Sequence, residues 1–256
     1  MSQKQLSYLN TVTLPHPLNH TFITLIPKIK NPLTVNDFRP ISLCKVLYKK
    51  IPKVLANRLK KILPNIISKH QSAFTKNRLI SDNILVPFET LHSMKKHKTG
   101  KTGYIAVKLD MSKAYDRVEW AFLEEIMRKL GFEERWITLM MAFVKLVSNL
   151  ILVNGELKGL IRPSRGIHQG DPLSPSLFLL CTEGLHSLIA KAANEDSIRG
   201  FSLCKRSPRL THLLFADDSL LFCRANKHDS LKVLEILATY ECFGATNQLK
   251  QNLFIF

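Results

Sequence analysis

Two adjacent carboxylates, Asp217 and Asp218, interrupt two apolar runs, Leu213-Leu214 before the pair and Leu220-Leu221-Phe222 after it. The apolar arms favour burial, whereas each carboxylate needs water or a partner, so the arrangement is costly unless the charges are compensated. A divalent cation at the turn would compensate them, because hard cations prefer carboxylate oxygens. The pattern therefore indicates a hairpin that carries metal ligands.

A third carboxylate, Asp110, directly follows a strand predicted for residues 104–109. Phosphoryl transfer with two metals, about 4 Å apart, needs carboxylates from more than one strand, because one turn cannot surround both ions. One metal would lower the pKa of an attacking 3′-hydroxyl, and the other would neutralise a triphosphate and the leaving pyrophosphate. Asp110, Asp217 and Asp218 supply that minimum set. Each residue taken singly is equally compatible with a structural role, as a cap or a hairpin turn.

The loop of residues 166–175 (GIHQGDPLSP) is a second candidate for chemistry. Gly170 permits close backbone approach, and Gln169 offers a neutral hydrogen-bonding group. A helix is predicted to follow at once, capped by Ser174 and with Pro175 in its first turn. Such a loop suits a surface beneath a template base and an incoming nucleotide, and an ordinary Pro/Gly loop before a helix has the same composition.

The elements that must position these residues follow from periodicity. Strands are predicted for residues 21–29 and 38–43, and Asn154-Gly155 between apolar arms predicts a hairpin over residues 150–161. Pro52 is expected to kink or begin the first helix, and Pro64 to end it. The alternation of strands and helices predicts an α+β or α/β fold with a mixed or antiparallel sheet that helices cover on one face. Helical spacing covers residues 45–63, 81–94, 119–130, 133–147, 174–193 and 229–242.

The net charge of +17 is an electrostatic footprint for a polyanion, since self-repulsion of this size opposes folding. Ten basic residues lie between Lys28 and Lys61, against Asp37 alone. A single-sign stretch of this length favours nucleic acid over a merely solvated face or a membrane surface. The candidate nucleic-acid contacts are Lys28, Lys30, Lys45, Lys49 and Arg58.

The five cysteines are scattered, odd in number and never in a C-x-x-C pair, which fits a reducing compartment with neither a disulfide framework nor structural zinc. The nine histidines show no ligand spacing in the sequence. No signal peptide and no apolar run long enough to span a bilayer is present. We therefore expect an intracellular protein of the nucleus or cytoplasm, neither secreted nor bound to a membrane.

Five segments, in order, resemble the reverse transcriptases of LINE-type (non-long-terminal-repeat) retrotransposons, most like the plant ones. LDMSKAYDRVEW, RGIHQGDPLSPSLF and LLFADDSLLF match motifs A, B and C, and residues 23–43 and 70–85 match upstream motifs. The resemblance covers roughly residues 20–256 and implies one α+β right-hand polymerase domain with an antiparallel palm sheet backed by helices. After a poorly defined segment 1–20, fingers would span 21–103 and the palm 104–256, with the hairpin 150–168 at their junction.

The resemblance also implies roles for individual residues. Asp110, Asp217 and Asp218 become the catalytic acids, and Asp110 and Asp217 the main ligands of two Mg²⁺ ions, with Mn²⁺ as a substitute. The Met111 carbonyl would contribute to this metal site. Tyr115 matches the aromatic gate that blocks a ribose 2′-hydroxyl and so favours dNTPs.

Further matched positions would hold the substrate. Arg39 resembles the finger residue that grips the triphosphate, a task suited to a bidentate guanidinium. Gln169 and Gly170 match the pair that faces nucleotide and template, and Lys250 matches the motif D lysine that assists pyrophosphate departure. The implied partners are an RNA template, a DNA primer and dNTPs.

The family has an endonuclease upstream and a thumb and a nucleic-acid module downstream, so we expect this chain to be a fragment without a thumb. A catalytically silent nucleic-acid-binding remnant of a decayed retroelement is the competing hypothesis. An RNA-directed RNA polymerase is a weaker one, since Tyr115 disfavours ribonucleotides.

Overall fold

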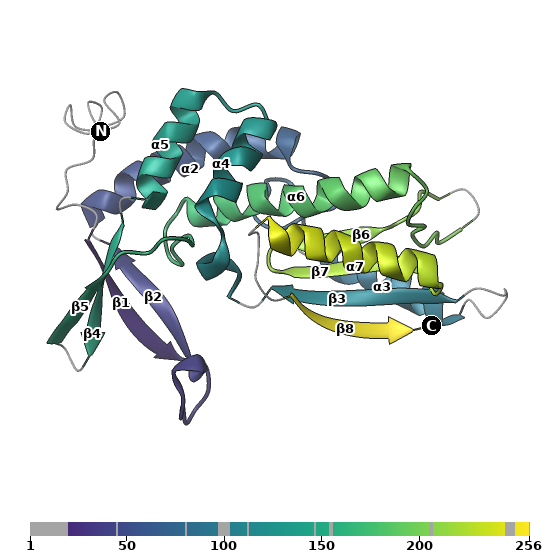
Figure 1. Ribbon diagram of the computed structural model, residues 1–256, viewed down its shortest axis with the longest axis horizontal. Coiled ribbons are helices and arrows are strands. Elements are labelled where there is room, and N and C mark those ends of the chain that lie inside the picture. Colours follow the sequence, from purple (N-terminus) through teal and green to yellow (C-terminus); the bar gives the residue numbers. More distant parts are fainter. Residues whose placement is uncertain are drawn as a thin grey trace.

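The computed structural model describes residues 20–44, 46–79, 81–96, 103–111, 113–145, 147–153, 156–204, 207–243 and 249–255. Two four-stranded sheets organise this part of the chain (Figure 1). The first has the order β2-β1-β4-β5, in which β1 pairs antiparallel with β2 and parallel with β4. Its strands are β1 (His20–Pro27), β2 (Phe38–Cys44), β4 (Ser148–Val153) and β5 (Glu156–Ile161).

The second sheet has the order β6-β7-β3-β8 and is antiparallel throughout, which confirms the predicted antiparallel palm sheet. Its strands are β3 (Tyr104–Met111), β6 (His212–Phe215), β7 (Asp218–Arg224) and β8 (Leu249–Ile255). The edge strand β8 was not predicted as a strand from the sequence.

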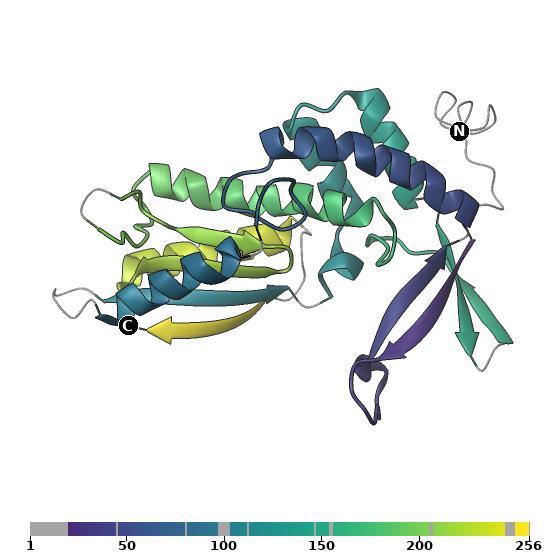
Figure 2. The ribbon, with the colours of Figure 1, turned by 180° about the vertical axis from the view of Figure 1, so that it is seen from behind.

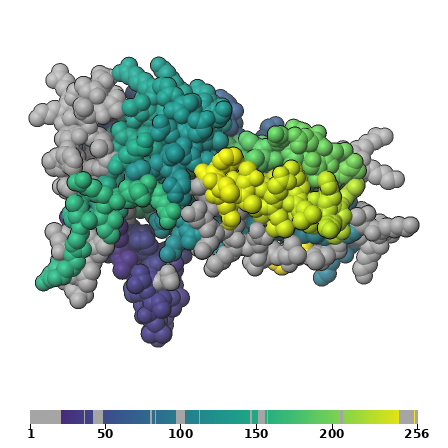
Figure 3. Space-filling model, viewed as in Figure 1, coloured from purple at the N-terminus to yellow at the C-terminus, as the bar shows by residue number. Residues whose placement is uncertain are grey.

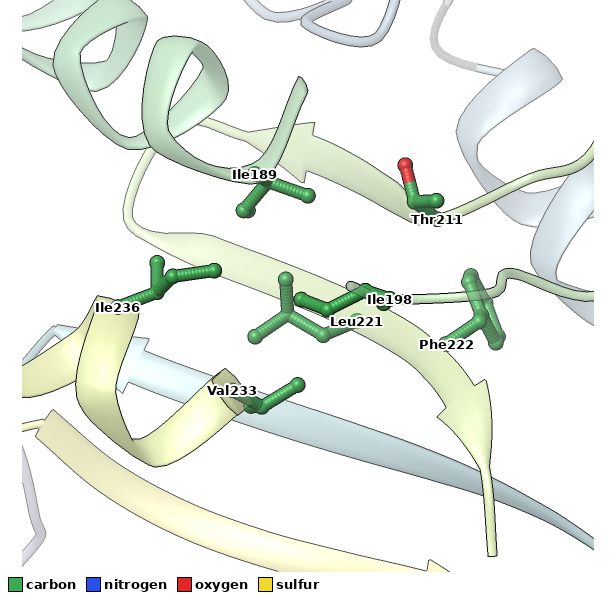
Figure 4. A pocket seen from close by; sticks show the side chains of 7 residues that line it. All are labelled: Ile189, Ile198, Thr211, Leu221, Phe222, Val233 and Ile236. Carbon is green, nitrogen blue, oxygen red and sulfur yellow. The ribbon is translucent and has the colours of Figure 1, made fainter. Parts of the chain in front are cut away.

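Helices α6 (Ser174–Asn194) and α7 (Lys227–Cys242) cover one face of the second sheet (Figure 1). They pack on alternate residues of the central strands, which are apolar on that side. Ile189, Leu221 and Ile236 line a small apolar cavity of about 10 Å³ between α6, β7 and α7 (Figure 4). The hairpin that carries the two adjacent aspartates therefore packs on the apolar core between the sheet and helices α6 and α7.

The other face of this sheet is covered in part by α3 (Asp82–Lys96), as the view from behind shows (Figure 2). Met94 of α3 packs with Ala106 of β3 and Phe222 of β7, and all three side chains are buried. Buried apolar residues on both faces explain why β3 and β7 read as nearly continuous apolar runs.

Helix α2 (Val46–Ile66) contains both Pro52 and Pro64, so the predictions that it begins at Pro52 or ends at Pro64 were wrong. An interior proline costs about 3 kcal/mol. Full burial of one leucine or isoleucine contributes about 1.5–3 kcal/mol, and α2 buries several on one face. Tertiary packing therefore outweighs the proline penalty. The buried residues are Ile51, Leu55, Leu59 and Leu63.

The remaining helices, α4 (Trp120–Lys129) and α5 (Glu134–Lys145), agree with the predicted positions to within a few residues. The strands β4 and β5 form the predicted hairpin, whose Asn154-Gly155 turn lies outside the described residues. Figure 3 shows the β1–β2 hairpin extending away from the helical body. Within the described ranges, none of the helices is both long and apolar enough to cross a membrane.

Candidate active site

The register of β3 and β7 places Asp110 directly opposite Asp218. Residues opposite each other in a sheet project to the same face, and like charges in that position destabilise the pair. Asp217 occupies the turn, and its carbonyl accepts a hydrogen bond from the Met111 N–H at 3.2 Å. The three predicted aspartates thus lie at one end of the β3–β7 pair.

Lys108 forms an ion pair with one of these acids. Its Nζ lies 3.4 Å from Asp218 Oδ1, and both side chains are about half exposed. In the part of the chain that the structure describes, this is the one ion pair of the three aspartates, and it compensates a single carboxylate. Exposed carboxylate oxygens in excess are the donor set that a hard divalent cation prefers, so the residues fit such an ion.

The turn that carries Asp217 is strained and supported from outside the hairpin. Ala216 has a φ of +51°, a left-handed conformation that a non-glycine residue adopts at a cost. Its N–H donates to Gln71 Oε1 at 3.2 Å, and the Ala73 N–H donates to the same oxygen at 3.0 Å. Gln71 Nε2 donates in turn to Thr182 Oγ1 at 3.2 Å. The fully buried Gln71 amide therefore fixes the turn that carries Asp217.

The backbone around Gln71 runs alongside β6. The Leu214 N–H donates to the His70 carbonyl at 2.8 Å, and the Ser72 N–H donates to the Leu214 carbonyl at 3.3 Å. The Arg78 guanidinium holds this segment by donating to several of its carbonyls, including that of Ile67 at 2.9 Å. Sequence reasoning missed this support. The signal for it in the sequence is the segment His-Gln-Ser-Ala-Phe at residues 70–74, which belongs to the stretch 70–85 that resembles an upstream motif.

The 3₁₀ turn Ala114–Arg117, which follows Asp110, is fastened to the loop before α6. The Tyr115 carbonyl accepts the Ile167 N–H at 2.8 Å, and the Val118 carbonyl accepts the Gly166 N–H at 2.8 Å. Gly166 has a φ of +90°, and a Cβ there would lie 2.8 Å from the Asp116 carbonyl oxygen. Trp120 Nε1 donates to the Gly166 carbonyl at 2.8 Å. These hydrogen bonds join the segments of motif A (109–120) and motif B (165–178) into one unit.

Tyr115 belongs to this unit and is close enough to Asp217 to be affected by its charge. Its ring stacks on Phe178 of α6, with centroids 5.0 Å apart and planes inclined by 15°. Burial and the negative charge of Asp217 raise the pKa of the Tyr115 hydroxyl to about 12. The phenol therefore stays neutral, and its position is set by packing beside the carboxylates.

The loop leading into α6 exposes Gln169 and Gly170, and Gly170 has a φ of +101°. Asp171 is buried, and its Oδ1 accepts the Leu173 N–H at 2.7 Å. Leu173 occupies the N-cap, so the prediction that Ser174 caps α6 was wrong by one position. Burial lowers the pKa of His168 to about 4, which keeps this neighbour of Gln169 uncharged at neutral pH.

The other predicted site residues are spread over the molecule. Arg39 is exposed on β2, where it pairs with Ile26 of β1. Its sheet is not the one that carries the three aspartates, and within the described ranges Arg39 forms no ion pair with them. Lys250 of β8 stands opposite Asp110 in the register. Lys28 and Lys30 are exposed beyond β1, Arg58 is exposed on α2 and Lys49 is half-buried there. Lys45 lies outside the described residues.

The fold is that of right-hand polymerases. A solved structure of apo telomerase from Candida tropicalis, truncated from its C-terminal domain, is similar with a TM-score of 0.61. The identity is 18%, and the match covers 94% of this chain and 51% of that one. At this identity the likeness shows the fold alone.

The chain belongs to the family described as reverse transcriptase (RNA-dependent DNA polymerase), which matches residues 26–253. An uncharacterized protein of transposon TX1 from Xenopus laevis is 28% identical over 208 residues, covering 81% of this chain and 15% of the relative. The Pol polyprotein of the retrotransposable element R2DM from Drosophila melanogaster is 31% identical over 67% of this chain and 16% of its own length. These relatives confirm the predicted resemblance to non-long-terminal-repeat retrotransposons.

A plant relative is also similar. An uncharacterized mitochondrial protein of Arabidopsis thaliana is 51% identical over 70 residues, which are 27% of this chain and 57% of that protein. The chain spans 57% of this relative and about a sixth of the transposon TX1 and R2DM proteins.

Proposed function

We propose that this chain is the polymerising part of a reverse transcriptase that extends a DNA primer on an RNA template. The observation that carries the proposal is the β3–β7 register, which brings Asp110 opposite Asp218 while Met111 is bonded to Asp217 in the turn. Membership of the reverse transcriptase family supports the same reaction.

Asp110, Asp217 and Asp218, with the Met111 carbonyl, would hold two Mg²⁺ ions, or Mn²⁺ in their place. When bound, such ions lower the pKa of the primer 3′-hydroxyl and neutralise the charge on the triphosphate and the pyrophosphate. The excess of carboxylate charge over Lys108 supports this assignment. Tight anchoring of the turn by Gln71 supports it as well, since phosphoryl transfer depends on positioning.

The protein's own residues would position the substrates. Tyr115, fixed on Phe178, would lie under the sugar and leave no room for a 2′-hydroxyl. Gln169 and Gly170 would face the template base and the nucleotide from an exposed loop. Arg39 would bind the triphosphate through a bidentate contact, and Lys250, opposite Asp110, would assist the departure of pyrophosphate.

The exposed basic residues of the first sheet and α2 would hold the RNA and the DNA through their phosphates. Lys28, Lys30 and Arg58 are exposed, which supports this role. Lys45 and Lys49 are the further candidates, and contacts of this kind bind without reading sequence.

Primer extension with purified protein tests the proposal. We expect Mg²⁺-dependent incorporation of dNTPs on an RNA template and its loss, by about a thousandfold or more, in Asp217→Asn, because the turn then loses a charged ligand. Asp82→Asn, an exposed change on α3, is the matched control and should keep full activity. Salt-dependent RNA binding without any extension in the wild type would instead identify a silent binding remnant.

A further inference from the structure

Three histidines from separate segments meet behind the catalytic hairpin. His70 follows α2, His186 belongs to α6 and His212 begins β6, and one ring nitrogen of each lies within 4.8 Å of the others. His186 Nδ1 is 2.8 Å from His212 Nε2. The His70 ring stacks on that of His212, with centroids 4.4 Å apart. Their separation along the chain explains why the sequence shows no ligand spacing.

The three imidazoles line one side of a pocket of about 200 Å³. Asn194 and Arg209 line it as well, and Arg209 is held by an ion pair with Asp196 at 3.5 Å. A volume of this size leaves room for a water or a small anion beside the ring nitrogens. The cluster is therefore open on one side, and half-exposed His70 and His186 can adjust toward the pocket.

Thr211 determines which nitrogen of His212 points into the cluster. Its Oγ1 is 2.9 Å from His212 Nδ1, and its side chain is fixed on the other side among the apolar residues of Figure 4. When the Thr211 hydroxyl oxygen accepts a hydrogen bond from His212 Nδ1–H, the lone pair of Nε2 faces His186. Most histidine ligands of metals are oriented in this way, by a hydrogen bond from the ring nitrogen that does not bind the metal.

We propose that His70, His186 and His212 form a binding site for a transition-metal ion, Zn²⁺ above all, distinct from the carboxylate site. Neutral imidazoles suit zinc, copper and nickel, whereas Mg²⁺ prefers oxygen. Three histidines with an open fourth position are a known arrangement for tetrahedral zinc. Zinc–nitrogen distances of about 2.0–2.1 Å place two ligand nitrogens about 3.3 Å apart, so the His186–His212 pair opens by about 0.5 Å on binding.

Such an ion would join three segments that support the catalytic turn. The His70 carbonyl accepts the Leu214 N–H, and the next residue, Gln71, holds Ala216. His212 lies in the strand that leads to the Asp-Asp turn. The site would therefore stabilise the scaffold of the active site without contacting substrate.

Titration with Co²⁺ tests the site, because tetrahedral Co²⁺ absorbs visible light strongly and octahedral oxygen-bound Co²⁺ does not. The full chain is titrated in excess Mg²⁺, which occupies the carboxylates. We expect one Co²⁺ per chain with a tetrahedral spectrum, its displacement by Zn²⁺, and a higher unfolding temperature with either metal. Absence of the tetrahedral bands in the wild type would overturn the proposal.

His186→Gln and His212→Gln should lose the spectrum, and His228→Gln, an exposed change on α7, should retain it. His186 is half-exposed, so its variant remains informative if the change at buried His212 prevents folding. Thr211→Val should weaken Co²⁺ binding about 10–100-fold, because it removes the group that orients His212. Bands that persist in a folded His186→Gln protein would also refute the assignment.

Discussion

In the sheet β6-β7-β3-β8, the residues proposed for catalysis are held by hydrogen bonds from several segments, whereas in β2-β1-β4-β5 the residues proposed for substrate binding are exposed at the surface. The Asp-Asp turn is held by Met111, Gln71 and the segment beside β6. In contrast, Leu33 and Val35 at the tip of the β1–β2 hairpin are 93% and 78% exposed. Arg39 is exposed on the same hairpin.

The difference separates two physical tasks. Chemistry at a phosphorus atom requires acids held within a fraction of an ångström, which a doubly covered sheet and buried hydrogen bonds provide. Contact with a nucleic-acid backbone is a charge effect that tolerates motion. Changes in the anchored sheet should therefore reduce the rate, and changes in the exposed sheet should weaken binding.

Gln71→Leu should have the largest effect on the anchored sheet. It leaves the Ala216 and Ala73 N–H groups without their acceptor, which costs about 1–3 kcal/mol of unfolding free energy. Displacement of the turn by about 1 Å should lower kcat for primer extension about 100-fold. Thr182→Val, which removes only the partner of Gln71 Nε2, should reduce kcat less. Equal kcat in Gln71→Leu and the wild type would contradict the role of this amide.

Gly166→Ala tests the junction between motifs A and B. The left-handed φ and the 2.8 Å approach to the Asp116 carbonyl should together cost about 1–3 kcal/mol in urea unfolding. Gly131→Ala is the matched control, because Gly131 has a φ of +83° and no atom near its missing Cβ. It should cost about 1 kcal/mol, the backbone term alone. Equal losses in the two variants would show that the junction does not require close approach.

Glu183 should make the anchored sheet less stable as the pH rises. Burial raises its pKa from 4.5 to about 7, against the opposing effects of hydrogen bonds from Ser68 and the charge of Arg78. Between these two pH values the folded chain binds more protons than the unfolded one, so this contribution to stability falls as pH rises through that window. Relative to Glu183→Gln, the wild type should lose about 2–3 kcal/mol between pH 4.5 and pH 8. Glu89→Gln, exposed on α3, should not change the profile.

Arg58→Ala should have the smallest effect, and on binding rather than rate. Removing one phosphate contact should reduce the slope of log affinity for RNA against log salt by about one, with kcat unchanged. Lys129→Ala removes an exposed cation from α4, where it pairs with Glu125 at 3.7 Å, and serves as the control. A large fall in kcat for Arg58→Ala would contradict the claim that the exposed basic residues affect binding rather than rate.

The sequence predicted the parts of this fold that local pattern encodes. The apolar arms around Asp217-Asp218 and the strand before Asp110 were correctly placed, because alternation and length define a strand without knowledge of its partners. Helix α2 was the clearest error, since the penalty of Pro52 is local but the burial that offsets it comes from other elements.

Long-range polar contacts could not be predicted in this way. Gln71 and Ala216 are 145 positions apart, and nothing in either segment shows that the amide reaches the turn. The three histidines escaped notice for the same reason, as did β8, whose pairing with β3 decides its conformation. A single sequence displays periodicity, whereas buried polar partners depend on the assembled fold.

The ion pair between Lys108 and Asp218 has a consequence for how the carboxylate site would be filled. The ammonium is a tethered competitor for the same oxygen that an incoming cation would use. A metal ion that binds Asp218 would then have to displace the Lys108 ammonium. The lysine would therefore raise the metal-ion concentration at which the carboxylate site is half occupied. The chain would thereby carry its own threshold for metal loading, set by a lysine two positions before Asp110.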